Sequence, residues 1–227
     1  LYRGCTHDCA YCDGRAESYR VPGVFGRDVT VKVNAPELLA RELDPAGRRR
    51  PPTPDSYVLV GGGVGDCYEG LEAKQELTRR VLEVLAARAF PAHVLTKSSL
   101  VERDFDLLDK IHARRRAIVS MSFSTADDDL AAVFERGASP PSRRFETLAR
   151  AKARGYGTGV FLMPVLPFLS DDAASIAAVL KGARDAGVDF VLFGGLTLKP
   201  GRQMRHYLSV LEGYDASLVP RYKALYG

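Results

Sequence analysis

Tryptophan is absent from this 227-residue chain, and histidine, cysteine and methionine are scarce, with four, four and three residues. No apolar run approaches the roughly 18–20 residues that a membrane-spanning helix needs, and the first residues show no secretory signal pattern. We therefore expect a cytoplasmic protein without membrane association. The hydrophobic fraction of 46% and the charged fraction of 26% exclude disordered and collagen-like chains and are typical of a domain with one sizeable core.

Neither sign of charge dominates, since 32 Lys and Arg residues face 28 Asp and Glu residues for a net charge of +4. This balance permits a nucleic-acid partner without demonstrating one. Three short arginine-rich stretches are either solvated surface or parts of a phosphate-binding face: Arg48 to Arg50, Arg114 to Arg116, and Arg143 with Arg144. A nucleic-acid groove requires such residues on one face among aromatic side chains.

Three of the four cysteines are crowded together at Cys5, Cys9 and Cys12, and Cys67 stands alone. Pairing within the group would leave one thiol over, so the pattern does not describe a disulfide framework. Thiols with the spacing C-x3-C-x2-C on a short loop can instead converge on one soft metal centre.

Two kinds of metal centre use cysteines in this way. Structural zinc usually takes two pairs of cysteines or two Cys and two His, and here only His7, inside the same loop, is available as a fourth ligand. Ferredoxin-type clusters take four cysteines, so three thiolates leave one iron of a four-iron cluster without a protein ligand. An open coordination position is what permits chemistry at a metal. The spacing favours the open cluster, and a zinc-stabilised nucleic-acid-binding module without catalysis is the alternative.

The motif C-x3-C-x-aromatic-C, formed by Cys5, Cys9, Tyr11 and Cys12, resembles the signature of the radical S-adenosylmethionine (SAM) enzymes. The longer string that starts at Tyr2 resembles the spore photoproduct lyase branch, also called DNA-repair photolyase-like. The resemblance implies that the three cysteines hold a [4Fe-4S] cluster and that S-adenosylmethionine chelates the fourth iron. It further implies reductive cleavage of S-adenosylmethionine to a 5′-deoxyadenosyl radical, which abstracts hydrogen from the substrate, with a flavodoxin- or ferredoxin-type electron donor. The substrate itself is not implied, and a nucleic-acid lesion is the leading candidate.

Apolar strands alternate with amphipathic helices along most of the chain. The predicted strands cover 57–60, 93–96, 117–123, 159–166 and 190–193, and the predicted helices cover 71–89, 105–113, 142–154 and 172–187. This alternation indicates an α/β fold with a parallel sheet. The resemblance narrows it to a partial (β/α)6 TIM-like barrel with the cluster loop after the first strand. We expect a single radical SAM core domain over residues 1–227, whose first barrel strand precedes Leu1 or is only a stub, and a short accessory strand at 29–33.

In barrels of this kind the chemistry collects at the carboxyl ends of the strands. At these ends the resemblance implies contacts with S-adenosylmethionine, from Tyr11 at the adenine and from the set Gly61, Gly62, Gly63, Lys97, Ser122 and Arg144 elsewhere. The acidic residue usual after the glycines is absent, and Asp66 or Glu69 is the candidate substitute. Each of these residues also has a structural interpretation, such as a turn glycine, a solvated lysine or a strand serine bonded to a carbonyl.

Cys67 and its neighbour Tyr68 follow the same predicted strand as the glycines. A radical can abstract the hydrogen of a thiol or of a phenol, so both residues are candidate hydrogen-atom donors to a substrate radical. The resemblance to spore photoproduct lyase places its donor cysteine nearer to Gly63 than to Cys67. The other interpretation of Cys67 is a small buried hydrophobic residue.

Overall fold

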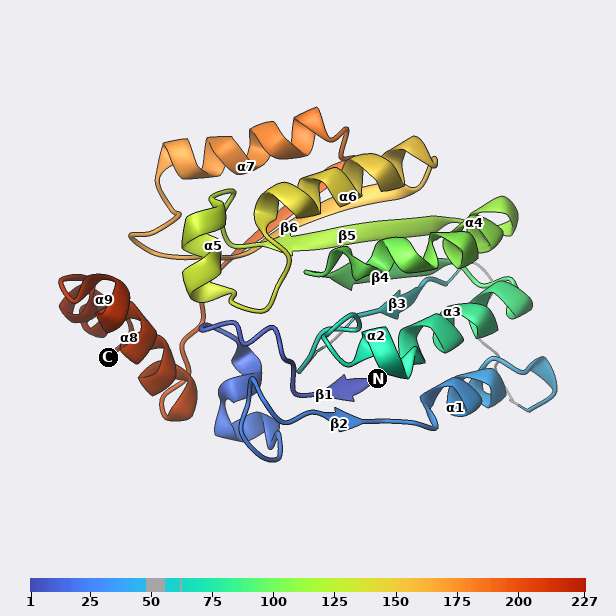
Figure 1. The fold of residues 1–227 in the computed structure, drawn as a ribbon, viewed down its shortest axis with the longest axis horizontal. Helices are drawn as coiled ribbons and strands as arrows, with labels where there is room; N and C mark the ends of the chain where they lie inside the picture. Colours follow the sequence, from blue (N-terminus) through green and yellow to red (C-terminus); the bar gives the residue numbers. More distant parts are fainter. Residues whose placement is uncertain (48–55, 62) are drawn as a thin grey trace.

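The computed structural model describes residues 1–47, 56–61 and 63–227, and at its centre lies a five-stranded parallel sheet (Figure 1). Each strand lies next to its neighbour in sequence, in the order β3-β4-β5-β6-β7. The bounds are β3 (Val58–Val60), β4 (Ala92–Thr96), β5 (Ala117–Phe123), β6 (Gly157–Val165) and β7 (Phe190–Gly195). The five predicted strands and their parallel arrangement are confirmed, with ends that shift by one or two residues.

Helices connect these strands and cover the outer face of the curved sheet (Figure 1). The four that follow β3 to β6 are α3 (Leu77–Arg88), α4 (Phe105–Arg114), α6 (Pro141–Ala153) and α7 (Ala173–Asp185). Alternate strand residues point toward them, and Val94, Val119 and Val160 are fully buried. This face therefore holds the main hydrophobic core, and the carboxyl ends of the strands are free to carry chemistry. The chain has the α/β fold that its sequence predicts.

The predicted helix over 71–89 is divided into α2 (Glu72–Gln75) and α3, with Glu76 between them in the left-handed conformation at φ +49°. The cause is the buried side chain of Glu72. Its carboxylate accepts hydrogen bonds from the backbone N–H of Thr78 at 2.9 Å and of Arg79 at 3.3 Å, so it caps the first turn of α3. Helical periodicity continues across the break, which is why the sequence suggests one helix.

Several helices have no counterpart in the sequence prediction: α1 (Ala35–Glu42), α5 (Asp128–Phe134), α8 (Arg202–Asp215), α9 (Leu218–Tyr226), and the 3-10 turns η1 (Asp13–Arg15), η2 (Glu17–Tyr19), η3 (Pro45–Gly47) and η4 (Ser99–Asp104). The pair α8 and α9 packs beside the N-terminal loop (Figure 1). Tyr207 and Leu211 of α8 share a hydrophobic cluster with Cys9 and Ala10 of that loop. The C-terminal helices therefore support the cysteine-bearing segment.

The cysteine loop follows a two-residue strand, β1 (Tyr2–Arg3), which pairs antiparallel with β2 (Thr30–Val31). β2 lies within the accessory strand predicted at 29–33. In the described part of the chain β1 is not a member of the parallel sheet, but the backbone N–H of Gly4 donates to Val64 O at 3.0 Å. This hydrogen bond holds the start of the cysteine loop beside the end of β3.

Two further expectations concern membrane association and predicted residues that lie outside the described ranges. Within the described ranges, none of the helices combines the length and apolar character that crossing a membrane requires. The arginine stretch from Arg48 to Arg50 and the predicted cofactor contact Gly62 lie outside the described residues.

Candidate functional site

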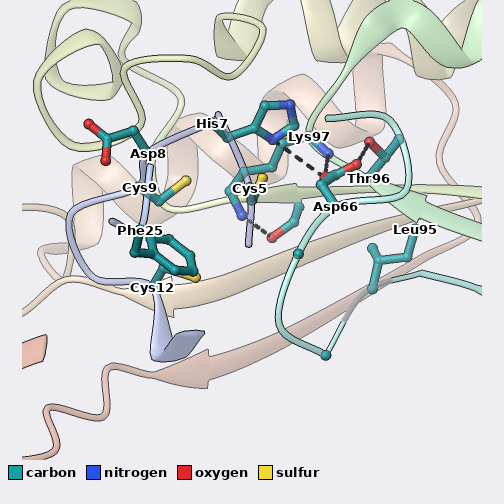
Figure 2. Close-up of a pocket in the computed structure, with 13 residues that line it drawn as sticks. Cys5, His7, Asp8, Cys9, Cys12, Phe25, Asp66, Leu95, Thr96 and Lys97 are labelled. Carbon is teal, nitrogen blue, oxygen red and sulfur yellow. Dashed lines mark hydrogen bonds and ion pairs between the residues drawn. The ribbon is translucent and has the colours of Figure 1, made fainter. Parts of the chain in front are cut away.

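The three cysteines of the N-terminal loop share one cavity of about 180 Å³ (Figure 2). All three are free thiols, with Cys5 and Cys9 buried and Cys12 half-buried. The loop leaves β1 at Gly4, where φ is +90° and a Cβ would lie 2.6 Å from the carbonyl oxygen of Asp28. Glycine is required there, because any side chain would block the turn that carries the loop across the strand ends.

The opposite wall of the cavity comes from the carboxyl ends of β3, β4 and β5. Its residues include Gly63, Gly65, Asp66, Leu95, Thr96, Lys97 and Ser122. Parallel strands present their carboxyl ends at one edge of a sheet, so residues far apart in sequence meet there. The structure thus brings the predicted residues Gly63, Lys97 and Ser122 together with the three cysteines.

Lys97 and Asp66 place opposite charges side by side in this wall (Figure 2). Lys97 Nζ donates to Ser122 Oγ at 2.8 Å, and the backbone N–H of Lys97 donates to Asp66 Oδ2 at 2.8 Å. Asp66 Oδ1 accepts from Thr96 Oγ1 at 2.5 Å, and His7 Nδ1 lies 3.6 Å from Asp66 Oδ2. A ligand in the cavity therefore meets a fixed carboxylate and a fixed ammonium group.

Of the two candidate acids, Asp66 reaches the cavity and Glu69 does not. Glu69 is fully buried and accepts a 2.9 Å hydrogen bond from Thr6 Oγ1, so it holds the middle of the cysteine loop. The loop is also fastened through its backbone, because Ala10 N donates to Phe134 O at 2.8 Å. These hydrogen bonds hold the cysteine loop at Thr6 and at Ala10 without a contribution from a metal.

No motif in the sequence points to Glu135, a fully buried carboxylate behind the cavity wall. It accepts hydrogen bonds from the Tyr11 hydroxyl, from the Arg144 guanidinium and from Ser124 Oγ, and Lys97 Nζ lies 4.0 Å from its Oε1. Burial alone would raise the pKa of Glu135, but the cations of Arg144 and Lys97 and the Tyr11 hydrogen bond lower it to about 2. Glu135 is therefore ionised at neutral pH and links the cysteine loop to the sheet.

Tyr11 and Arg144 lie behind the wall rather than in it. Tyr11 is 6% exposed, and its ring centroid lies 5.7 Å from Lys97 Nζ. Arg144 is fully buried, and besides Glu135 its guanidinium donates to the carbonyl oxygens of Ser139 at 2.6 Å and Ser122 at 2.7 Å. The positive charge at the start of α6 is thus matched by Glu135, and the predicted contact of Arg144 with the cofactor stays a prediction.

The predicted glycine turn is only partly at the cavity. Gly63 lines it, whereas Gly61 lines a separate groove beside α1. A Cβ on Gly63 would have nothing within 4 Å, so the backbone at this point is open to a ligand.

Cys67 and Tyr68 belong to the hydrophobic core between the sheet and its helices. Cys67 is 2% exposed, its Sγ donates to Val60 O at 3.4 Å, and burial raises its pKa well above the usual value. Tyr68 is 1% exposed and donates to Asp104 Oδ2 at 2.9 Å. Neither side chain lines the cavity. Their role as hydrogen-atom donors stays a prediction, and the contacts of Cys67 are those of a buried structural residue.

Gln203 of α8 fixes the far side of the cysteine loop. Its buried Nε2 donates to Tyr11 O at 2.9 Å and to Asp13 Oδ1 at 3.0 Å. Lys199 Nζ donates to the other carboxylate oxygen of Asp13 at 2.7 Å. The residues on either side of Cys12 are therefore held by the C-terminal part of the chain.

None of the arginines of the described stretches lines the cavity. Arg114 and Arg115, at the end of α4, donate to backbone carbonyls at the end of α3 at 3.2 and 3.1 Å. Arg143 pairs with Glu102 at 2.9 Å, and Arg144 is the buried partner of Glu135. Most of these arginines thus already bond to carbonyl or carboxylate groups of the chain itself.

A family model described as the Radical SAM superfamily matches residues 1–180. The chain belongs to the radical SAM superfamily. The radical SAM match contains the cysteine loop and β3 to β6, and it ends inside α7. β7, α8 and α9 therefore lie beyond the part of the chain that the radical SAM model describes.

This radical SAM chain is similar to uncharacterized proteins of distant organisms. It is 31% identical over 229 residues to one from Mycobacterium tuberculosis, a match that covers 99% of this chain and 65% of that protein. It is 28% identical over 209 residues to one from Methanocaldococcus jannaschii, with 91% and 73% covered. The chain thus spans 65% of the length of the mycobacterial relative.

Two solved structures of spore photoproduct lyase share the radical SAM fold. A mutant with bound AdoMet and dinucleoside spore photoproduct gives a TM-score of 0.64 at 18% identity, covering 92% of this chain and 59% of that one. The enzyme complexed with dinucleoside spore photoproduct gives 0.63 at 16% identity, covering 95% and 59%. These likenesses establish the partial-barrel fold.

The donor set of this radical SAM chain fits an open iron–sulfur cluster. Burial raises the pKa of all three thiols, to about 12 for Cys9, so binding of a metal centre displaces their protons. Among residues 1–47, 56–61 and 63–227, no three His, Cys, Asp or Glu side chains are gathered closely enough to hold one metal ion. A zinc ion with His7 requires that convergence, whereas a four-iron cluster takes each thiolate on a separate iron.

Proposed function

We propose that this chain binds a [4Fe-4S] cluster through Cys5, Cys9 and Cys12 and cleaves S-adenosylmethionine reductively to start hydrogen abstraction from a substrate. The observation that carries this proposal is the meeting of the three thiols with Lys97 and Asp66 around one cavity. When bound, such a cluster supplies an electron to the sulfonium group and an open iron for the amino and carboxylate groups of the cofactor. Membership of the radical SAM superfamily supports this class of chemistry.

Asp66 and Lys97 recognise the amino-acid end of S-adenosylmethionine in this proposal. An amino N–H of the cofactor can donate to the Asp66 carboxylate and the cofactor carboxylate can pair with Lys97, because both side chains line the cavity. Ser122 Oγ accepts a hydrogen bond from Lys97 Nζ and so orients the ammonium group of Lys97. The exposed backbone of Gly63 admits the ligand without a side chain in the way.

Glu135 and Arg144 supply the charge balance behind the wall. Their ion pair is fully buried, so each largely neutralises the other. Lys97 is then left as the cation whose charge is available to a carboxylate in the cavity. The hydrogen bond from the Tyr11 hydroxyl to Glu135 holds the cysteine loop at a fixed position relative to Lys97.

We also propose a nucleic-acid lesion as the substrate class. This is supported by the likeness in fold to spore photoproduct lyase structures that contain a dinucleoside spore photoproduct. Binding of a lesion-containing oligonucleotide, compared with an undamaged one, tests it at low and at physiological salt. Phosphate contacts weaken steeply with salt, so binding is expected at low salt and reduced at physiological salt. No binding at low salt would remove nucleic acid as the substrate.

An external one-electron carrier of the flavodoxin or ferredoxin type is the proposed reductant, because cleavage consumes an electron that must enter from outside the cavity. Reduced flavodoxin with its reductase is expected to replace dithionite in the assay below. This part of the proposal is contradicted if deoxyadenosine forms with dithionite but fails to form with reduced flavodoxin and also with reduced ferredoxin.

Anaerobic reconstitution with iron and sulfide, followed by dithionite and S-adenosylmethionine, tests the proposed reaction. The wild-type chain is expected to show cluster absorbance and to form 5′-deoxyadenosine, detected by chromatography. The variant with Cys5, Cys9 and Cys12 all changed to Ala is expected to show neither. Stoichiometric zinc without a cluster would overturn the proposal in favour of a zinc-stabilised binding module. A cluster without deoxyadenosine would overturn the cleavage step alone.

A further inference from the structure

Phe25 enters the cavity from a segment outside the cysteine motif. Residues 20–28 join η2 to β2 and turn at Gly23 and Gly26, where φ is +72° and +92°. Asp28 closes the turn, because its Oδ2 accepts a 2.8 Å hydrogen bond from the backbone N–H four residues earlier. Between the two glycines, the Phe25 side chain lines the cavity together with Cys12 (Figure 2).

Two neighbours hold the ring of Phe25 in place. The guanidinium carbon of Arg15 lies 4.9 Å from the ring centroid, and Arg15 is itself paired with Asp8. A Cβ on Gly14 would lie 2.5 Å from the ring edge, so the ring packs directly on the backbone two residues after Cys12. The ring therefore has one defined place beside the third cysteine.

Core packing does not account for this arrangement. In the part of the chain that the structure describes, the three hydrophobic core clusters do not include Phe25. Its neighbour Val24 faces solvent and is 54% exposed. Two left-handed glycines and a carboxylate cap thus build a turn whose one inward apolar side chain faces the thiols.

We propose that Phe25 is an apolar shield for the side of the metal centre that Cys12 holds, an inference that rests on the proposed function. Solvent exposure and the apolar surroundings of an iron–sulfur cluster control its reduction potential and its access to solvent. Cys12 is the half-buried member of the three cysteines, so its sulfur is the one that needs covering. Phe25 covers it from the side opposite to the strand ends and limits entry of water and oxygen.

The shield is tested first on the metal-free chain, where no cofactor is involved. Anaerobic alkylation with iodoacetamide, followed by peptide mass spectrometry, gives a rate for each cysteine. Phe25→Ala is expected to raise the rate at Cys12 several-fold and to leave buried Cys67 unreactive. Phe25→Tyr, which keeps the ring, and Val24→Ala, the exposed neighbour, are expected to react like wild type. An equal increase at Cys67 would show general unfolding and would overturn the shield.

The second test uses the reconstituted chain and a change at a different residue. Gly14→Ala pushes the ring away without removing it, so it is expected to act like Phe25→Ala. Both variants are expected to lose cluster absorbance several-fold faster in air than wild type and to shift the midpoint potential, and Val24→Ala is expected to do neither.

The two tests separate the shield from the proposed function. Increased alkylation of Cys12 in a chain that assembles no cluster would overturn the proposed function and support the position of the ring. A cluster whose air sensitivity and potential are unchanged in both Phe25→Ala and Gly14→Ala would overturn the shield and leave the proposed function standing.

Discussion

Gln203 on α8 donates a 2.9 Å hydrogen bond to the backbone carbonyl of Tyr11, a residue that stands 192 positions earlier in the chain. The same amide group reaches the carboxylate of Asp13, directly after the third cysteine. One buried side chain from the C-terminal helices therefore fastens the end of the cysteine loop. The radical SAM family model stops before this helix, so the contact comes from residues outside the range that the family model matches.

Gln203→Leu is expected to lower the free energy of unfolding by about 1–3 kcal/mol, because the buried Tyr11 carbonyl then lacks this donor and the Asp13 carboxylate loses one of its donors. Urea unfolding of the metal-free chain measures this difference. Gln75→Leu, at an exposed position, is the matched control and is expected to change stability by less than about 0.5 kcal/mol. Equal effects of the two substitutions would contradict the role of Gln203.

Glu135→Gln is expected to destabilise the chain by about 3–5 kcal/mol at neutral pH, because Arg144 then lacks its counter-charge. The pKa of Glu135 in the folded chain is about 2, below the usual 4.5, so its stabilisation is present above about pH 4.5 and is lost as pH falls toward 2. The stability difference between wild type and variant therefore narrows in acid. Unfolding curves recorded across this pH range check it, and a constant difference would count against the ion pair.

Lys97→Met is expected to weaken binding of S-adenosylmethionine to the cluster-loaded chain by roughly ten- to a hundredfold, the value of a hydrogen bond to a charged group. Equilibrium dialysis with labelled cofactor measures the affinity. Iron content should equal that of wild type, and Lys97→Arg, which keeps the charge, should retain more of the affinity. Unchanged affinity in Lys97→Met would remove Lys97 from the site.

Cys67→Ala is expected to bind as much iron as wild type, whereas single alanine substitutions of Cys5, Cys9 or Cys12 lose it. The reason is that Cys67 Sγ is turned into the core, toward the carbonyls of Val60 and Leu95. Colorimetric iron analysis after reconstitution makes the comparison. Loss of iron in Cys67→Ala would make Cys67 a ligand, and an altered product with unchanged deoxyadenosine would support its predicted role as a hydrogen donor.

The strands were predictable because each is a short run rich in apolar and β-branched residues, as in Val58 to Val60 and in Ala117 to Val119. Their carboxyl ends meet by topology alone, which is why Lys97 and Ser122 could be placed with the cysteines. The break at Glu76 was not predictable, since it depends on where the side chain of Glu72 turns. Local pattern thus predicts the elements, and tertiary contacts decide where they stop.

The parts of the site that escaped prediction depend on partners distant in sequence. Glu135 stands nine residues before Arg144 in the sequence, and no motif shows that the two form a buried ion pair. Gln203 and Phe25 belong to no motif, because each acts through contacts with the cysteine loop that exist only in the folded chain. A phenylalanine between two glycines is a weak sequence signal for a turn that presents an aromatic ring. Only the structure shows that this ring lines the cavity.

The bond between Gln203 and Tyr11 also orders events in time. A ribosome releases Tyr11 192 residues before Gln203, so the nascent chain carries a cysteine loop without this hydrogen bond while the intervening residues are made. Contacts between such distant residues form late, because a long stretch of chain must be closed to make them. Under the proposed function, a metal centre can therefore enter the completed loop only after α8 has been made and has packed against it.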